Sequence, residues 1–238
     1  RQRQMCIRDR RYGGVPLVLD VQDRDGNILV QRNTTSECVA QIIKDLDDAI
    51  ALLPAKFDET GRVARGAAHA LKGRVLLHYA SEQFNPSQEA SRWETAYQAN
   101  AAAVSFLEAN GYGLYPDFAG LWFDENNSEV VFSTGYVTPG KTHNRDACTR
   151  PLSEAQNCTG ANEPSLALVN AFPMKNGLPI TDANSGYDAT HYWLDRDPRF
   201  EATIAWNGAL WELSGKTGRR QWNYDGAVSG ADGNGPWG

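Results

Sequence analysis

The residues with the clearest chemical potential are aromatic rings and amides in the last quarter of the chain, set among glycine and charged residues without a regular period. A rigid aromatic ring offers flat apolar area at a low cost in conformational entropy, and neighbouring amides can hydrogen-bond hydroxyl groups. Sugar rings have flat C–H faces and hydroxyl edges, so this combination is typical of a glycan-binding platform. The candidate platform residues are Trp193, Trp206, Trp211, Trp222, Tyr224, Asn207 and Asn223.

A second interpretation of these aromatic residues stays open, in which each ring packs into a local loop core. Trp93 is different, because its place on the apolar face of a helical pattern predicts core packing. Trp122, in the stretch GLWFDENN, fits packing and display equally well.

Residues that could catalyse a reaction lack the spacing that catalysis requires. The pairs Asp124–Glu125 and Asp195–Asp197 could be offered as glycosidase carboxylates, but adjacency in sequence does not indicate the separation of about 5–9.5 Å across a sugar. The four histidines show no metalloprotease spacing, and neither a G-x-S-x-G motif nor a phosphate loop occurs. We therefore predict that the protein is not an enzyme.

The Arg196-Asp197-Pro198-Arg199 stretch resembles a catalytic constellation, but a structural role is favoured. An Asp before Pro tends to be extended and to begin a turn. Either arginine could bond backbone carbonyls that the loops leave unpaired.

The cysteines indicate one candidate disulfide. Cys148 and Cys158 flank nine residues, and in an exported protein a bridge between them would add up to about 3 kcal/mol of stability. Cys38, near the start of a helix, is predicted to be a buried free thiol. We expect no cofactor and no zinc site, although Asp182 with residues 187–188 could contribute to a structural calcium site.

Three amphipathic helices are predicted in the first half of the chain. The first runs from a Ser36 N-cap to Leu53, the second over residues 64–83, and the third from an S-x-x-E capping box at Ser91 to Asn110-Gly111. The second carries small residues on its inward face, Gly66, Ala67, Ala70 and Gly73, which would let a neighbouring helix approach closely. Such pairing is how tetratricopeptide-type helix hairpins pack, although no strict 34-residue period is present.

The character of the chain changes after Pro116. Residues 128–136 predict a strand, short helical or strand pieces are expected around 164–172 and 201–206, and the remainder is loop-rich. We predict a helical scaffold over residues 11–120 and a loop-rich binding region over residues 121–238.

Several segments, in order, resemble the SusD/RagB family of outer-membrane nutrient-binding lipoproteins. They are RYGGVPLVLD, DLDDAIALLP, GRVARGAAHALKGRVLLHYA, W-x3-Y followed by NGYGLYPDF, EVVF, NGLPITD and RDPRFEATIAWNG, and they span most of residues 11–210. The resemblance implies a mainly α fold of tetratricopeptide-like helix pairs with a loop-rich substrate-binding half carrying short strands. It also implies a lipid-anchored, surface-exposed protein of the outer membrane that passes oligosaccharides to a TonB-dependent transporter of the SusC type.

The opening RQRQMCIRDR does not resemble the start of this family. Back-translated in one frame, it resembles a transposase adapter used in sequencing libraries, so we interpret residues 1–10 as an artefact and expect the encoded protein to begin upstream. The signal peptide, the lipidated cysteine, the first helices and the C-terminal part would then be missing, so we expect a fragment, incomplete at both ends, that aggregates or is only partly ordered.

Composition agrees with a folded protein that does not bind nucleic acid. The whole chain carries a net charge of −6 and the first ten residues +3, so the remainder carries −9, which disfavours a polyanionic ligand. Two rival functions remain: a helical-repeat scaffold that binds a protein, and a piece of a glycoside hydrolase.

Overall fold

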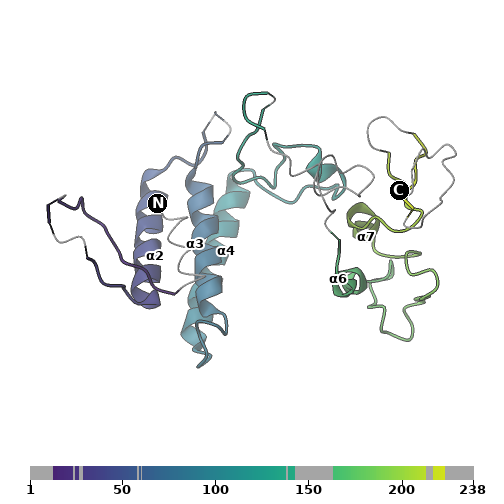
Figure 1. The fold of residues 1–238 in the computed structure, drawn as a ribbon, viewed down its shortest axis with the longest axis horizontal. Helices are drawn as coiled ribbons and strands as arrows, with labels where there is room; N and C mark the ends of the chain where they lie inside the picture. The colour runs from purple at the N-terminus through teal and green to yellow at the C-terminus, as the bar shows by residue number, and fades with distance from the viewer. Residues whose placement is uncertain are drawn as a thin grey trace. The chain divides into compact units, whose positions relative to one another are not determined.

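The computed structural model describes residues 13–23, 25–26, 29–57, 59, 61–137, 139–142, 163–212 and 217–222 (Figure 1). The chain divides into two compact units. The first contains Arg1–Tyr115 and Glu125–Gly135, and the second contains Pro116–Asp124 and Tyr136–Gly238.

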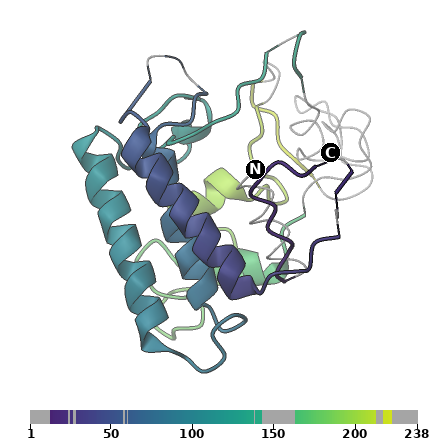
Figure 2. The same ribbon diagram turned by 90° about the vertical axis from the view of Figure 1, so that its left-hand side faces the viewer.

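Three helices form the first unit: α2 (Thr35–Leu52), α3 (Arg65–Ala80) and α4 (Ala90–Ala109). They lie side by side, with α3 packed against both α2 and α4 (Figures 1 and 2). Ile42, Leu46 and Ala68 form the buried core between α2 and α3. The mainly helical architecture expected from the sequence is confirmed for the part of the chain that the structure describes.

The N-cap of α2 is Thr34, so the prediction of Ser36 was wrong. The Thr34 hydroxyl accepts a hydrogen bond from the Glu37 backbone N–H, and the Glu37 carboxylate accepts one from the Thr34 N–H at 2.8 Å. This reciprocal capping box satisfies two donors that the first turn of a helix leaves without partners. Hydrogen bonds to the carboxylate lower the pKa of Glu37, the bond from the Thr34 N–H contributing most, followed by those from the side chains of Thr34 and Asn33.

Close packing of α3 against α4 depends on the glycines of α3, as the sequence predicted. A Cβ at Gly73 would lie 2.5 Å from Oδ1 of Asn100, and one at Gly66 would lie 2.9 Å from a methyl carbon of Leu107. The Asn100 amide donates to the Gly73 carbonyl at 3.1 Å, which is a direct bond from one helix to the other.

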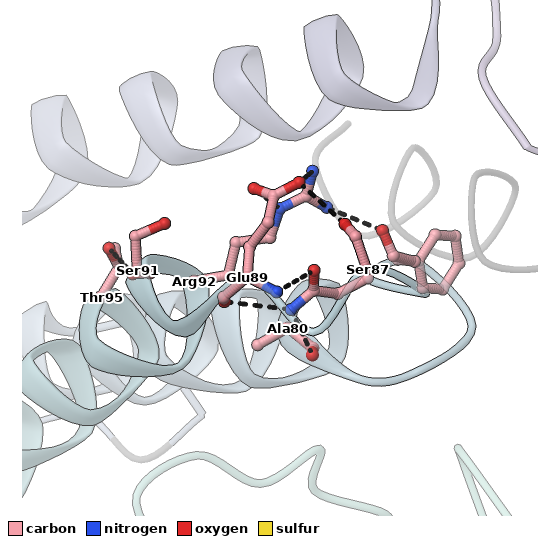
Figure 3. Close-up of polar contacts among 8 residues, drawn as sticks. Ala80, Ser87, Glu89, Ser91, Arg92 and Thr95 are labelled. Atoms are coloured by element: carbon pink, nitrogen blue, oxygen red, sulfur yellow. Dashed lines mark hydrogen bonds and ion pairs between the residues drawn. The ribbon is translucent and has the colours of Figure 1, made fainter.

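The connection between α3 and α4 determines where α4 begins, and the capping box predicted at Ser91 was wrong. Asn85 is fully buried, and its amide bonds the Ala80 and Glu89 carbonyls and the Glu89 N–H. Arg92 pairs with the Glu89 carboxylate and donates to the Phe84 carbonyl (Figure 3). These bonds start the helix at Ala90, so Ser91 already lies inside it, where its carbonyl accepts from the Thr95 hydroxyl (Figure 3).

Core packing of Trp93 was also predicted wrongly, because 42% of this residue is exposed. The buried residues of α4 are Ala96 and Ala103. Small residues face α3 because its glycines allow a close approach, and this geometry leaves no room for an indole there. The predicted end of α4 is confirmed, since Gly111 follows it with φ +76°.

The second unit has little regular structure among its described residues. It contains a 3₁₀ turn, η1 (Gly120–Trp122), and two short helices, α6 (Leu166–Ala171) and α7 (Pro198–Thr203). Both helices agree with the predicted short pieces, although α7 starts earlier, where Asp197 caps it and Pro198 occupies its first turn.

The short strands expected from the sequence, including one at residues 128–136, are absent from the described part of the chain. Pairing there consists of three isolated bridges, Val137 with Lys141, Met174 with Arg196, and Leu210 with Arg220. Residues 132–136 have no regular secondary structure, because no ladder of backbone hydrogen bonds turns them into a strand.

Two further features of the described residues concern Cys38 and the membrane. Cys38 is a buried free thiol, as predicted, and its sulfur accepts a hydrogen bond from the Val15 N–H. None of the helices described is long and apolar enough to span a bilayer.

Candidate functional site

Two of the predicted platform tryptophans stack on each other in the second unit. The rings of Trp193 and Trp206 are nearly parallel, with centroids 5.1 Å apart and an interplanar angle of 8°. Both side chains are half-buried, so each stacks one face on its partner and remains partly accessible. We call these residues, together with Trp222, the indole cluster.

The loop that carries Trp193 is fixed by a polar turn. The Asp188 carboxylate accepts a hydrogen bond from the Thr190 N–H at 2.8 Å and lies 2.7 Å from Nδ1 of His191. The bond to His191, followed by the one from Thr190, lowers the pKa of Asp188. His191 and Tyr192 in turn place their ring edges against Trp193, with centroids 5.7 and 5.1 Å away. The HYW stretch is therefore one packed aromatic unit.

Arg196 anchors the same loop from beneath. It is only 6% exposed, and its guanidinium donates to the carbonyls of Tyr192, Val169 and Phe172 at 2.7–2.8 Å. Its carbon Cζ also lies 4.6 Å from the centroid of the Phe200 ring. The predicted structural role of Arg196 is thereby confirmed: it donates hydrogen bonds to carbonyls that the loops leave without backbone partners.

Arg199 has a different role, because it bonds a carboxylate rather than backbone carbonyls. Its guanidinium donates to both oxygens of Asp197 at 2.8 Å, and its backbone N–H donates to the same carboxylate as the N-cap of α7. These bonds, that of the Arg199 side chain first, lower the pKa of Asp197 to about 2. Helix α7 then leads directly to Trp206.

A short β-like pairing brings Trp222 to the cluster. The Gly208 N–H donates a hydrogen bond to the Gln221 carbonyl at 2.6 Å, and the backbone N–H of Trp211 donates one to the Arg219 carbonyl. Gly208 has φ +93°, and a Cβ there would lie 3.3 Å from the Trp222 ring and 3.4 Å from the Trp206 ring. Glycine is thus required at this position both for the turn and for the two indoles that contact it.

The structure gathers some of the predicted site residues and not others. Trp193 stacks on Trp206, Trp206 and Trp222 both border Gly208, and Asn207 is half-buried in the turn that links Trp206 to Gly208. Trp211 lies on the pairing segment, half-buried, and its Nε1 has no hydrogen-bond partner among the residues described. Four predicted residues lie outside the described part of the chain: Tyr224, Asn223, Cys148 and Cys158.

Sequence reasoning missed His191, Tyr192 and Gly208 as members of this site. The signal for the first two was their position directly before Trp193, because adjacent aromatic residues in a tight turn can place their rings edge to face. Trp122, for which packing and display were equally favoured, is displayed, with 72% of its surface exposed.

The cluster offers apolar ring surface bordered by polar groups, which is an arrangement for binding rather than for catalysis. Of the carboxylates near Trp193 in sequence, Asp188 is bonded to His191 and Asp197 to Arg199. No group of three or more histidine, cysteine or acidic side chains suited to a metal ion occurs in the part of the chain that the structure describes. The calcium site considered around Asp182 therefore gains no support.

A groove of about 1330 Å³ lies in the first unit, along α2, α3 and residues 129–134. Its lining is dominated by aliphatic side chains such as Ile42, Leu46, Leu71 and Val75. Sugars need convergent hydrogen-bonding groups, so this groove is a poorer candidate for binding them than the indole cluster.

Two sequence-family descriptions match the chain. Residues 128–238 match the description "SusD family", and residues 10–77 match "Starch-binding associating with outer membrane". No curated protein matches the chain.

Solved structures share this fold. A SusD-like protein from Bacteroides fragilis is 26% identical over 87% of this chain, with a TM-score of 0.69. A SusD-like carbohydrate binding protein from the same species is 22% identical over 89% of the chain, with a TM-score of 0.68. A structure with a bound xylogluco-oligosaccharide is 18% identical over 89% of the chain, with a TM-score of 0.64. The chain spans 42%, 39% and 40% of the lengths of these three proteins, respectively.

Proposed function

The chain belongs to the SusD/RagB family, and from this membership we propose that it is part of a protein that binds oligosaccharide nutrients without chemically altering them. The indole cluster is the proposed binding platform. In the full-length protein, this function would operate at the cell surface, on a lipoprotein of the outer membrane that passes its ligand to a TonB-dependent, SusC-like transporter.

The observation that carries this proposal is the parallel stack of Trp193 and Trp206 on a rigid loop support. Because the two indoles hold each other, and Arg196 and Gly208 fix the loops beneath them, a sugar ring would meet a surface whose side chains are already ordered. Preordering lowers the entropy lost on binding, which is the main cost for a weak ligand such as a neutral sugar. The fold shared with a structure that holds a xylogluco-oligosaccharide supports the same ligand class.

The test is calorimetric titration of the full chain, first with a panel of neutral oligosaccharides that includes xylogluco-oligosaccharides. Trp193→Ala is expected to weaken binding by about tenfold, because an aromatic contact is worth roughly 0.5–1.5 kcal/mol beyond its buried area. Trp122→Ala is the matched control, since Trp122 is an exposed indole of the same unit that lies outside the cluster. Thermal unfolding of each variant verifies that the fold is retained.

Equal loss of affinity in both tryptophan variants would remove the indole cluster from the proposal. If the chain binds no sugar in the panel but does bind a protein, the alternative function as a helical-repeat interaction scaffold is favoured instead.

A further inference from the structure

A second cleft, of about 290 Å³, lies in the first unit and is independent of the indole cluster. Before α3 it is bordered by Lys56, Phe57, Glu59, Gly61, Arg62 and Ala64. Gly111 and Tyr112 after α4, residues 126–128 and residues 130–133 complete its lining. Its volume is at the lower end of the range for ligand sites, about 300–1,000 Å³, and suits one small ring rather than a chain of them.

Two cations at this cleft are held over aromatic rings. The Lys56 ammonium lies 4.6 Å from the centroid of the Tyr112 ring, and the Arg62 guanidinium lies 4.5 Å from the centroid of Phe57. Such contacts are worth about 0.5–1 kcal/mol at exposed sites and restrict where the charged group can go. The cleft therefore presents its positive charge from ordered positions.

Only one of these two cations is neutralised by the acidic residue described in the cleft. Arg62 pairs with the carboxylate of Glu59 at 3.2 Å. Lys56 takes part in none of the ion pairs among the described residues, and the ring of Tyr112 is its observed partner. An unpaired ammonium over a π face retains its donors and its charge for an incoming anion.

The remaining wall supplies polar groups in fixed positions. Asn127 is buried, its carbonyl accepts from Val130, and its side chain accepts from the Glu129 N–H at 2.9 Å. The Ser128 carbonyl accepts from the Gly113 N–H at 3.1 Å, which ties residues 126–133 to the end of α4. The wall is thus rigid, and it carries hydroxyl and amide groups of the kind that bind sugar hydroxyls.

From these observations we propose that the cleft is a second carbohydrate site, which takes a single anionic sugar residue of the uronic acid class, with its carboxylate against Lys56. The ring fits a cleft of this volume, and the carboxylate complements Lys56, the cation of the cleft that has no carboxylate partner among the described residues. The inference goes beyond the proposed function, because it concerns a different unit, different residues and a charged ligand.

The experiment titrates the full chain with galacturonic acid, galactose and acetate, observed by NMR line shifts or calorimetry. Galacturonic acid is expected to bind, and Lys56→Gln is expected to weaken that binding by about tenfold, since hydrogen bonds to charged groups are worth roughly 1.5–3 kcal/mol. Lys44→Gln is the matched control, because Lys44 is an exposed lysine of the same unit that pairs with Asp48 away from the cleft.

The comparisons between ligands and variants distinguish the possible results. If galactose binds as tightly as galacturonic acid, the proposal is overturned, because the carboxylate then contributes nothing to the affinity. Acetate binding equally well, or an unchanged affinity in Lys56→Gln, would also overturn it. Trp193→Ala should leave the binding of galacturonic acid intact. The proposal for the indole cluster and the proposal for the cleft can therefore fail independently of each other.

Discussion

At the residue scale, Arg196 is the organising side chain of the second unit. A loop-rich segment leaves backbone carbonyls without partners, and each of them is costly to bury. The planar guanidinium of Arg196 satisfies three of them from one position, which links α6 and the residue after it to the HYW turn. The bond from Arg196 to the Tyr192 carbonyl helps to hold the neighbouring Trp193 in the indole cluster.

Replacing Arg196 by methionine removes those three bonds while keeping most of the side-chain volume. We expect the free energy of unfolding to fall by about 3 kcal/mol or more, because the carbonyls remain buried without donors. Urea unfolding followed by tryptophan fluorescence measures this change. Arg199→Met is the control: it breaks an ion pair whose arginine is exposed and should cost less than about 1 kcal/mol.

Asp197 gives a prediction about acid stability. Its pKa is lowered from 3.8 to about 2, so the folded state favours the ionised carboxylate. The resulting stabilisation is present above the ordinary pKa and is lost as the pH falls from 3.8 towards about 2. Asp197→Asn keeps a capping oxygen but loses the charge, so the wild-type chain should be the more stable at neutral pH, and the difference should shrink over that window.

Acid titrations of unfolding in the wild type and in Asp197→Asn check this sign. A stability difference that stays constant from neutral pH down to pH about 2 would show that the Arg199–Asp197 pair contributes nothing through its charge.

At the element scale, the helices are set by caps and by small residues more than by large apolar ones. Helix α2 begins at a reciprocal capping box, and α3 approaches α4 through glycines. Asn85 and Arg92 then define the turn between α3 and α4. The capping box and the turn at Asn85 act between residues close in sequence, whereas the glycines of α3 act through a tertiary contact with α4.

The cap of α2 can be tested with two neighbouring hydroxyl residues. Thr34→Ala should lower the free energy of unfolding by about 1 kcal/mol, since it leaves the Glu37 N–H without its acceptor. Ser36→Ala, two residues further on at an exposed position inside α2, should change stability by less than about 0.5 kcal/mol. The reverse order of effects would restore Ser36 as the cap.

The glycine contact can be tested by a double-mutant cycle. Gly73→Ala gains about 1 kcal/mol of helix propensity but forces Asn100 aside and breaks its bond to Gly73, so we expect a net loss of about 1 kcal/mol. In an Asn100→Ala background the obstacle is absent, and the same substitution should become stabilising. Chemical unfolding of the four proteins measures the coupling, and additive effects would contradict the contact.

At the scale of the whole molecule, the two units differ in what holds them together. The first is a set of helices with an aliphatic core, whereas the second relies on side chains that satisfy loop carbonyls. The proposed sugar sites lie one in each unit, and each is built where chain segments converge rather than on a single helix.

The exposed aromatic face of α4 predicts how this chain behaves in solution. Trp93, Tyr97 and Val104 are 42%, 66% and 53% exposed, respectively, and fall on one side of the helix. Apolar patches of this kind promote association, so we expect concentration-dependent self-association that Trp93→Ser combined with Tyr97→Ser reduces. Light scattering measures it. Leu168→Ser, at an exposed position in α6, is the control and should have little effect.

The sequence by itself determined the elements whose information is local. The 3.6-residue apolar period placed α2, α3 and α4 to within a few residues, and the small face of α3 predicted its close packing. The order of short segments indicated the family, and the Arg196 stretch indicated a structural anchor. All of these depend on neighbours along the chain or on one repeated spacing.

Only the tertiary structure decided the rest, because it depends on distances between residues far apart in sequence. Trp193 and Trp206 stack, and Trp222 joins them, through a turn at Gly208 and a pairing with Gln221 that no local pattern encodes. Trp93 is exposed because α3 approaches α4 too closely to admit an indole, and residues 128–136 form no strand because no ladder of backbone hydrogen bonds joins them to another described segment. Burial and pairing are properties of two surfaces, and a sequence pattern describes only one of them at a time.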